Sequence, residues 1–150
     1  MITDALLTLS SAQAVTASAV STNTIDLSGS RDMAQGGNLY AVFGVDEAAT
    51  AAGAATVTFQ VITSANANLS SPSVLASTDA IPKADLTLGR RPINLRVNSS
   101  VLAAQNLGNR YLGVQYVVAT GPLVSGKFSC NLATSVTDLP RSFGSGFTAA

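Results

Sequence analysis

The chain has 150 residues, and no internal repeat or linker divides it, so we expect a single domain over residues 1–150. It carries eight basic residues, eight acidic residues and no histidine, and its formal net charge is zero. A neutral chain is a poor candidate for a nucleic-acid binder, and the lack of histidine removes the commonest general base and metal ligand. The single cysteine, Cys130, excludes an internal disulfide and a cysteine-built zinc site.

The first predicted element is an N-terminal arm over residues 1–12. Its large apolar side chains are Ile2, Leu6, Leu7 and Leu9. Monomers seldom expose such an apolar segment, so the arm either folds back onto the domain or inserts into a neighbouring molecule. Asp4 is its charged residue and the apolar run of residues 5–9 is short, so we do not expect a signal peptide. No apolar run reaches the length of a membrane span, and we expect a protein made and kept in a cytoplasm.

Apolar and polar residues alternate with a period of two along most of the remaining chain, and this period indicates β-strands. In residues 56–62, for example, Val57, Phe59 and Val61 share one face. The predicted strands cover, in chain order, residues 14–20, 24–27, 39–45, 56–62, 73–77, 93–98, 111–119 and 127–132. Segments 39–45 and 111–119 are apolar on both faces, as in strands that lie centrally or face a partner.

The spacers between these strands are rich in Gly, Pro, Ser and Asn, which favour turns. Short strands separated this regularly predict an all-β sandwich or barrel. Residues 46–52 are rich in alanine and begin with two acidic residues, so they fit either a short helix or a surface loop. Residues 141–150 contain small residues and glycine, and we expect them to form a flexible tail.

The search for catalytic chemistry gives no positive result. Cys130 alternates with Phe128 and Leu132, so we interpret it as a core residue. No nucleophile elbow, phosphate loop, dinucleotide fingerprint or EF-hand spacing is present in the sequence. We therefore expect no enzymatic activity, no catalytic residue, no cofactor and no metal. The adjacent carboxylates Asp46 and Glu47 carry a hydrolase hypothesis that needs no histidine.

The basic pair Arg90 and Arg91, followed by Pro92, is the densest positive point of the chain. Together with Arg96 it would form a salt-sensitive docking patch for an acidic partner. A solvated hairpin loop explains the same residues equally well.

Several short segments occur in a set order along about the first 135 residues. They are Ala-Gln-Ala-Val-Thr at 12–16, Ser-Thr-Asn-Thr-Ile-Asp-Leu at 21–27, Arg-Asp at 31–32, Leu-Tyr at 39–40, Ala-Asp-Leu at 84–86, Arg-Tyr-Leu-Gly at 110–113 and Gly-Pro at 121–122. This set resembles the capsid cement proteins of short-tailed bacteriophages, decoration proteins that clamp major capsid proteins together on the outside of the head. The resemblance implies a jelly-roll sandwich, which fits the eight strands predicted above. We therefore expect an eight-stranded jelly-roll-like β-sandwich with the N-terminal arm and the flexible C-terminal tail described above.

The resemblance also implies a non-enzymatic structural protein on the outer surface of the virion. It would be made in the cytoplasm of the bacterial host, and its partners would be the major capsid protein and further copies of itself, as dimers bound at two-fold positions of the capsid lattice. A homotrimer is the alternative for its self-association. The candidate interface residues are Ile2, Leu6, Leu7 and Leu9 of the arm, Arg90 and Arg91 of the basic loop, and Tyr111 and Tyr116 of the two-faced strand. The alternative is a carbohydrate-binding or adhesion module of a virion, although the chain has no Trp and only three Tyr for stacking on sugars.

Overall fold

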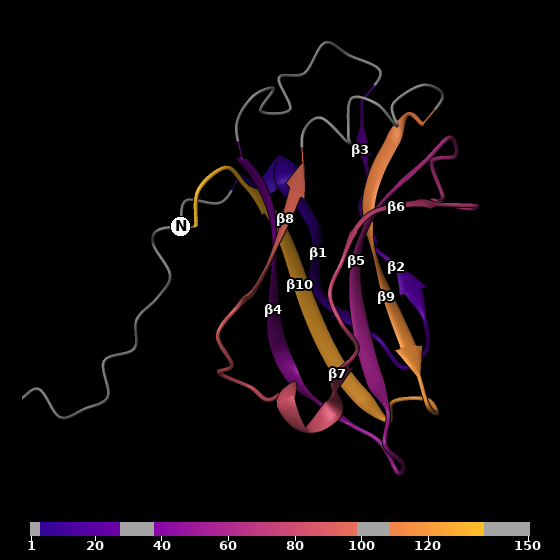
Figure 1. Cartoon of the computed structure of the whole chain (residues 1–150), viewed down its shortest axis with the longest axis vertical. Coiled ribbons are helices and arrows are strands. Elements are labelled where there is room, and N and C mark those ends of the chain that lie inside the picture. The colour runs from indigo at the N-terminus through magenta and orange to yellow at the C-terminus, as the bar shows by residue number, and fades with distance from the viewer. Residues whose placement is uncertain (1–3, 28–37, 99–108, 137–150) are drawn as a thin grey trace, which may run out of the picture.

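The computed structural model describes residues 4–27, 38–98 and 109–136, and these form a sandwich of two antiparallel β-sheets (Figure 1). The first sheet has the strand order β1–β10–β4–β8. Its strands are β1 (Thr8–Ala14), β10 (Ser125–Ala133), β4 (Asn38–Thr50) and β8 (Ile93–Asn98). Two short 3-10 helices complete the described elements, η1 (Ala5–Leu7) before β1 and η2 (Lys83–Asp85) before β8.

The second sheet is built around two long central strands with short strands on either side. Its strands are β9 (Tyr111–Ala119), β5 (Thr56–Ser64), β2 (Ala19–Val20), β3 (Ile25–Asp26), β6 (Ser73–Ser77) and β7 (Ile81–Pro82). Both β2 and β3 pair with β9, and both β6 and β7 pair with β5. At each edge of this sheet, two short strands therefore take the place of one edge strand. We call such a pair an interrupted strand.

The connections follow the jelly-roll order. When each interrupted strand is counted once, the sandwich has eight strand positions, four in each sheet. The chain changes sheet at every step except between β5 and β6, which are neighbours in the second sheet. The fold class predicted from the sequence is confirmed.

Three predicted strands agree with the structure at both ends, namely 73–77, 93–98 and 111–119. The predictions at 39–45, 56–62 and 127–132 lie within longer strands of the structure, and 24–27 contains β3. The prediction of one strand over 14–20 is wrong, because Val15 turns into the core and separates β1 from β2. The tail at 141–150 lies outside the described residues.

Two further predictions are corrected. Residues 46–50 form neither a helix nor a loop, because β4 continues along β10, where Glu47 lies opposite Lys127 and Thr50 lies opposite Ser125. The arm proposed for residues 1–12 ends earlier than predicted, because β1 begins at Thr8 and pairs with β10. This part of the arm folds back onto the domain, which is one of the two alternatives that the sequence left open. In both places a neighbouring strand supplies hydrogen-bond partners that the local sequence does not reveal.

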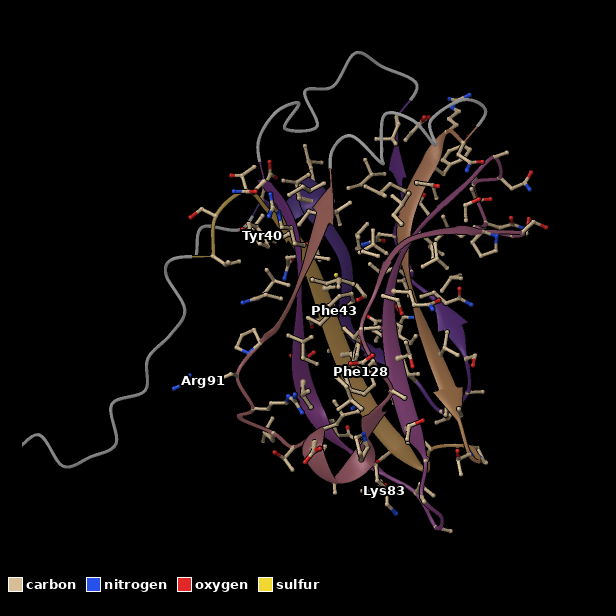
Figure 2. The ribbon with its side chains drawn as sticks, viewed as in Figure 1. Tyr40, Phe43, Lys83, Arg91 and Phe128 are labelled. Atoms are coloured by element: carbon tan, nitrogen blue, oxygen red, sulfur yellow. The ribbon has the colours of Figure 1, made fainter. Side chains whose placement is uncertain are left out.

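The core lies between the two sheets and is centred on four aromatic rings. Phe59 of β5 lies with its ring centroid 5.0 Å from Phe43, 5.3 Å from Phe128 and 5.7 Å from Tyr116. All four side chains are at most 1% exposed, and Figure 2 shows Phe43 and Phe128 pointing into the space between the sheets. Tilted and edge-to-face contacts of this kind add stability beyond the burial of apolar area.

One hydrogen bond joins two polar side chains inside this core. The hydroxyls of Ser10 on β1 and Tyr116 on β9 are hydrogen-bonded to each other, and both residues are fully buried. A buried hydroxyl without a hydrogen-bond partner destabilises the fold, so replacing either residue alone would leave the other hydroxyl unpaired. This contact also connects the two sheets.

The core makes the stability of the fold sensitive to alkaline pH. Burial raises the pKa of the Cys130 thiol, and burial also raises the pKa of the Tyr116 phenol, against the smaller opposing effect of the Ser10 hydrogen bond. In the unfolded chain these groups titrate near their ordinary values of about 8.5 and about 10. Above those values the unfolded chain has lost protons that the folded chain keeps, so the free energy of unfolding falls as pH rises.

We expect the contribution of these two groups to the free energy of unfolding, measured in urea, to be constant below about pH 8. Above about pH 8 the free energy of unfolding should fall progressively. The limiting slope is about 1.4 kcal/mol per pH unit for each group. Cys130→Ala is expected to remove the part of the loss between about pH 8.5 and 10. A wild-type stability that stays flat up to pH 11 would contradict the prediction.

A glycine in β9 accommodates a leucine on the outer face of the second sheet. Leu69, in the loop after β5, is 1% exposed and has a φ of 57°, which is rare for a leucine. A Cβ atom added to Gly113 would lie 2.3 Å from Leu69 Cδ1 and 3.0 Å from Ser21 Oγ. Because Gly113 has no side chain, Leu69 can pack against β9 at this position. The outer face of β9 is thus covered by Leu69, while its other face lies in the core.

Candidate interaction surfaces

The N-terminal segment is partly exposed and partly built into the fold. Asp4 caps η1 by accepting a hydrogen bond from the Leu6 amide at 2.9 Å. Leu6 is 77% exposed, whereas Leu7 is half-buried and packs against the core. Leu9 is fully buried, because its position on β1 directs it between the sheets. Of the arm residues proposed for an interface, Leu6 is the one on the surface, Leu9 belongs to the core, and Ile2 lies outside the described residues.

The two tyrosines proposed for an interface have different positions. Tyr116 is fully buried in the aromatic core, so it does not form part of a surface. Tyr111, at the start of β9, is half-buried. The sequence of β9 is apolar on both faces because the strand is central and Leu69 covers Gly113, so the pattern does not mark an exposed binding face.

Tyr111 lies next to an arginine that has acidic and aromatic partners. The Arg110 guanidinium carbon is 5.3 Å from the centre of the Tyr111 ring. Arg110 Nε and Nη2 donate to the two carboxylate oxygens of Asp26 at 2.8 and 2.7 Å. The pKa of Arg110 is raised by this hydrogen bonding and by the charge of Asp26. These contacts hold β3 beside β9, so we assign this cluster a structural role.

The basic loop follows η2 and has a defined turn. Leu86 is fully buried, and its carbonyl accepts a hydrogen bond from the Ala49 amide at 2.9 Å. The Arg90 amide donates to the Thr87 carbonyl at 3.2 Å, and Gly89 has a φ of +82°. A four-residue turn with positive φ at its third residue is of type II, which favours glycine there. Leu88 takes the second position of this turn and is 69% exposed.

The two arginines of the loop have different contacts. Arg90 Nη1 donates to the Asp85 carbonyl oxygen at 2.6 Å, so its guanidinium is already bound to the loop. Arg91 is exposed and points away from the sandwich in Figure 2. Within the described part of the chain, no hydrogen bond or ion pair holds its guanidinium. The structure therefore leaves Arg91 available for an external partner.

Leu88 is an exposed residue that the sequence alone did not single out. The exposed large apolar side chains among the described residues are Leu6, Val74, Leu88 and Val124. Leu88 is the one that shares a turn with arginines. The sequence does contain an indication of this exposure. Leu88 comes directly before the turn residue Gly89, in a segment without the alternating pattern that would predict its burial.

The acidic pair of the hydrolase hypothesis is bound to neighbouring residues. Ser129 Oγ donates to Asp46 Oδ2 at 2.5 Å, and Lys127 Nζ lies 2.7 Å from Glu47 Oε2. The hydrogen bond and the charge of Glu47 raise the pKa of Lys127. Both carboxylates thus contribute to the pairing of β4 with β10.

Residues 4–27, 38–98 and 109–136 contain no group of three or more acidic or cysteine side chains arranged to hold a metal ion. In the same ranges, no helix is long and apolar enough to cross a membrane.

The strand order defines a jelly-roll domain. The sequence matches the Bbp16 family over residues 9–132, and the chain belongs to this family. The matched region begins in β1 and ends in β10, so it covers the complete sandwich. A comparison with curated proteins found no match.

Proposed function

We propose that this chain is a non-enzymatic decoration protein of a bacteriophage head, which binds the outer surface of the shell and clamps major capsid protein subunits together. The Bbp16 family and the jelly-roll fold agree with a virion protein, and jelly rolls are common in viral capsids. The resemblance to capsid cement proteins supplies the specific role. The proposal also includes self-association as a dimer or a trimer.

The observation that carries the proposal is the turn of residues 87–91. It presents an exposed leucine and an arginine that no described residue binds, on a backbone fixed by hydrogen bonds. A fixed binding element loses less conformational entropy when it binds than a mobile one. Repeated over a symmetric shell, modest contacts of this kind add up to strong binding, because neighbouring copies and subunits are held together.

The test uses heads assembled without this protein. Purified full-length chain should co-sediment with such heads up to a saturating ratio, and decorated heads should release DNA at a higher temperature than bare heads. The control is an equal amount of an unrelated jelly-roll protein of similar size and charge. The proposal fails if the chain stays in the supernatant, or if saturated heads are no more resistant to heat and osmotic shock than bare heads.

A further inference from the structure

We infer that the turn of residues 87–91 recognises an apolar hollow bordered by carboxylates on its partner, with Leu88 entering the hollow and Arg91 pairing with the carboxylates. This inference rests on the proposed function, since the partner is taken to be a shell subunit. It assigns the chemistry of the contact, which the family match and the resemblance leave open.

The first argument is the rigidity of the turn. Its base is anchored by the buried Leu86, whose amide donates to the Lys83 carbonyl at 3.0 Å while its carbonyl accepts from Ala49. Its end is closed by the amide of Arg90 and by the Arg90 guanidinium on Asp85. Leu88 is thus held in an exposed position by contacts that do not involve its own side chain. An apolar side chain presented in this way suits insertion into a recess.

The second argument is charge. The segment of residues 83–92 contains three basic residues and one acidic residue, in a chain whose net charge is zero. Lys83 donates to the Ala51 carbonyl and Arg90 to the Asp85 carbonyl, so both side chains are engaged within the fold. Arg91, three residues after Leu88 in the sequence, adds a positive charge that no described residue neutralises. A local excess of positive charge complements a carboxylate-bearing surface, and guanidinium groups bind carboxylates through two parallel hydrogen bonds.

The third argument distinguishes this turn from the other exposed basic residues. Arg110 is paired with Asp26, and Lys127 is paired with Glu47. Lys127 lies three residues after the exposed Val124, but its ammonium is already paired with Glu47. Arg96 is exposed on β8, but no exposed large apolar side chain of the described residues lies within four residues of it. The turn places an exposed leucine and an arginine that no described residue binds within four residues.

The experiment measures binding of the full-length chain to heads assembled without it, at low and at high salt. Leu88→Ser is expected to weaken binding about tenfold at both salt concentrations, because burial of apolar area does not depend on charge. Arg91→Gln is expected to weaken binding about fivefold at low salt and much less at high salt. Arg91→Lys should retain the salt dependence with part of the affinity, since lysine keeps the charge but not the planar fork.

Two controls match these variants. Val124→Ser changes an apolar side chain that is 70% exposed elsewhere on the surface, and Lys127→Gln removes a basic residue that is already paired. Both are expected to bind within about twofold of the wild type. Thermal unfolding of every variant should match that of the wild type, because the altered side chains are exposed.

The outcomes separate the inference from the proposed function. Failure of the wild type to bind would overturn the proposed function, and the inference with it. Wild-type binding together with unchanged affinity of Leu88→Ser and Arg91→Gln would overturn the inference alone. Weaker binding by Arg91→Gln with the salt dependence of the wild type would also overturn it, because the partner would then not be acidic.

Discussion

Replacing Phe59 with alanine is expected to lower the free energy of unfolding by roughly 3–5 kcal/mol. Phe59 is fully buried and lies within 5.0–5.7 Å, centroid to centroid, of the other three aromatic rings of the core. Its removal therefore leaves a cavity that residues from both sheets line. Since small domains are stable by only about 5–15 kcal/mol, this substitution removes a large share of the total.

The measurement is equilibrium unfolding in urea, followed by circular dichroism at neutral pH. Leu88→Ala serves as the control, because Leu88 is 69% exposed and its truncation should change the free energy by about 0.5 kcal/mol or less. A loss below about 1 kcal/mol for Phe59→Ala would show that these rings do not form the centre of the core.

The second large effect is expected at Gly113, where alanine should destabilise the fold by about 1–3 kcal/mol through overpacking. The new methyl group would lie 2.3 Å from Leu69 Cδ1, and Leu69 is too buried to move into solvent. Gly44 in β4 is the matched control, because a Cβ atom there meets no atom within 4 Å. Gly44→Ala should be neutral or stabilise the protein by up to about 1 kcal/mol, since the unfolded chain loses conformational freedom.

Urea unfolding of the two glycine variants gives the comparison directly. Combining Gly113→Ala with Leu69→Ala should cost less than the sum of the two single losses, because the second change removes the atom that the new methyl group meets. Equal losses for Gly113→Ala and Gly44→Ala would show that the contact with Leu69 is not the cause.

The sequence predicts most of the sandwich because period-two alternation reports which face of a strand is buried. β9 is predicted at both ends from a run that is apolar on both faces. The alternating signal is clear in β8, which is also predicted at both ends. It fails in β1, where two register shifts and the φ of 44° at Ala12 interrupt the alternation. It also fails in the second half of β4, where a run of alanines fits a helix equally well and pairing with β10 decides the outcome.

The candidate site was only partly predictable. The charge of Arg90 and Arg91 is visible in the sequence, but the hydrogen bond that engages Arg90 depends on how η2 folds. Leu88 resembles a core residue by type, and its exposure follows from the turn geometry around Gly89. Tyr116 shows the reverse error, since an apolar face of β9 that suggested a partner is buried inside the same molecule.

The irregular edges of both sheets bear on edge-to-edge association between copies of this chain. A neutral protein has little electrostatic repulsion to keep its copies apart. Long, regular sheet edges would then template uncontrolled fibre growth. Here β1 is bulged, the outer positions of the second sheet are broken into pieces of two to five residues, and β8 is six residues long with Arg96 exposed on it. In this chain, the irregular hydrogen-bonding geometry of the sheet edges thus opposes aggregation, whereas in most proteins surface charge does so.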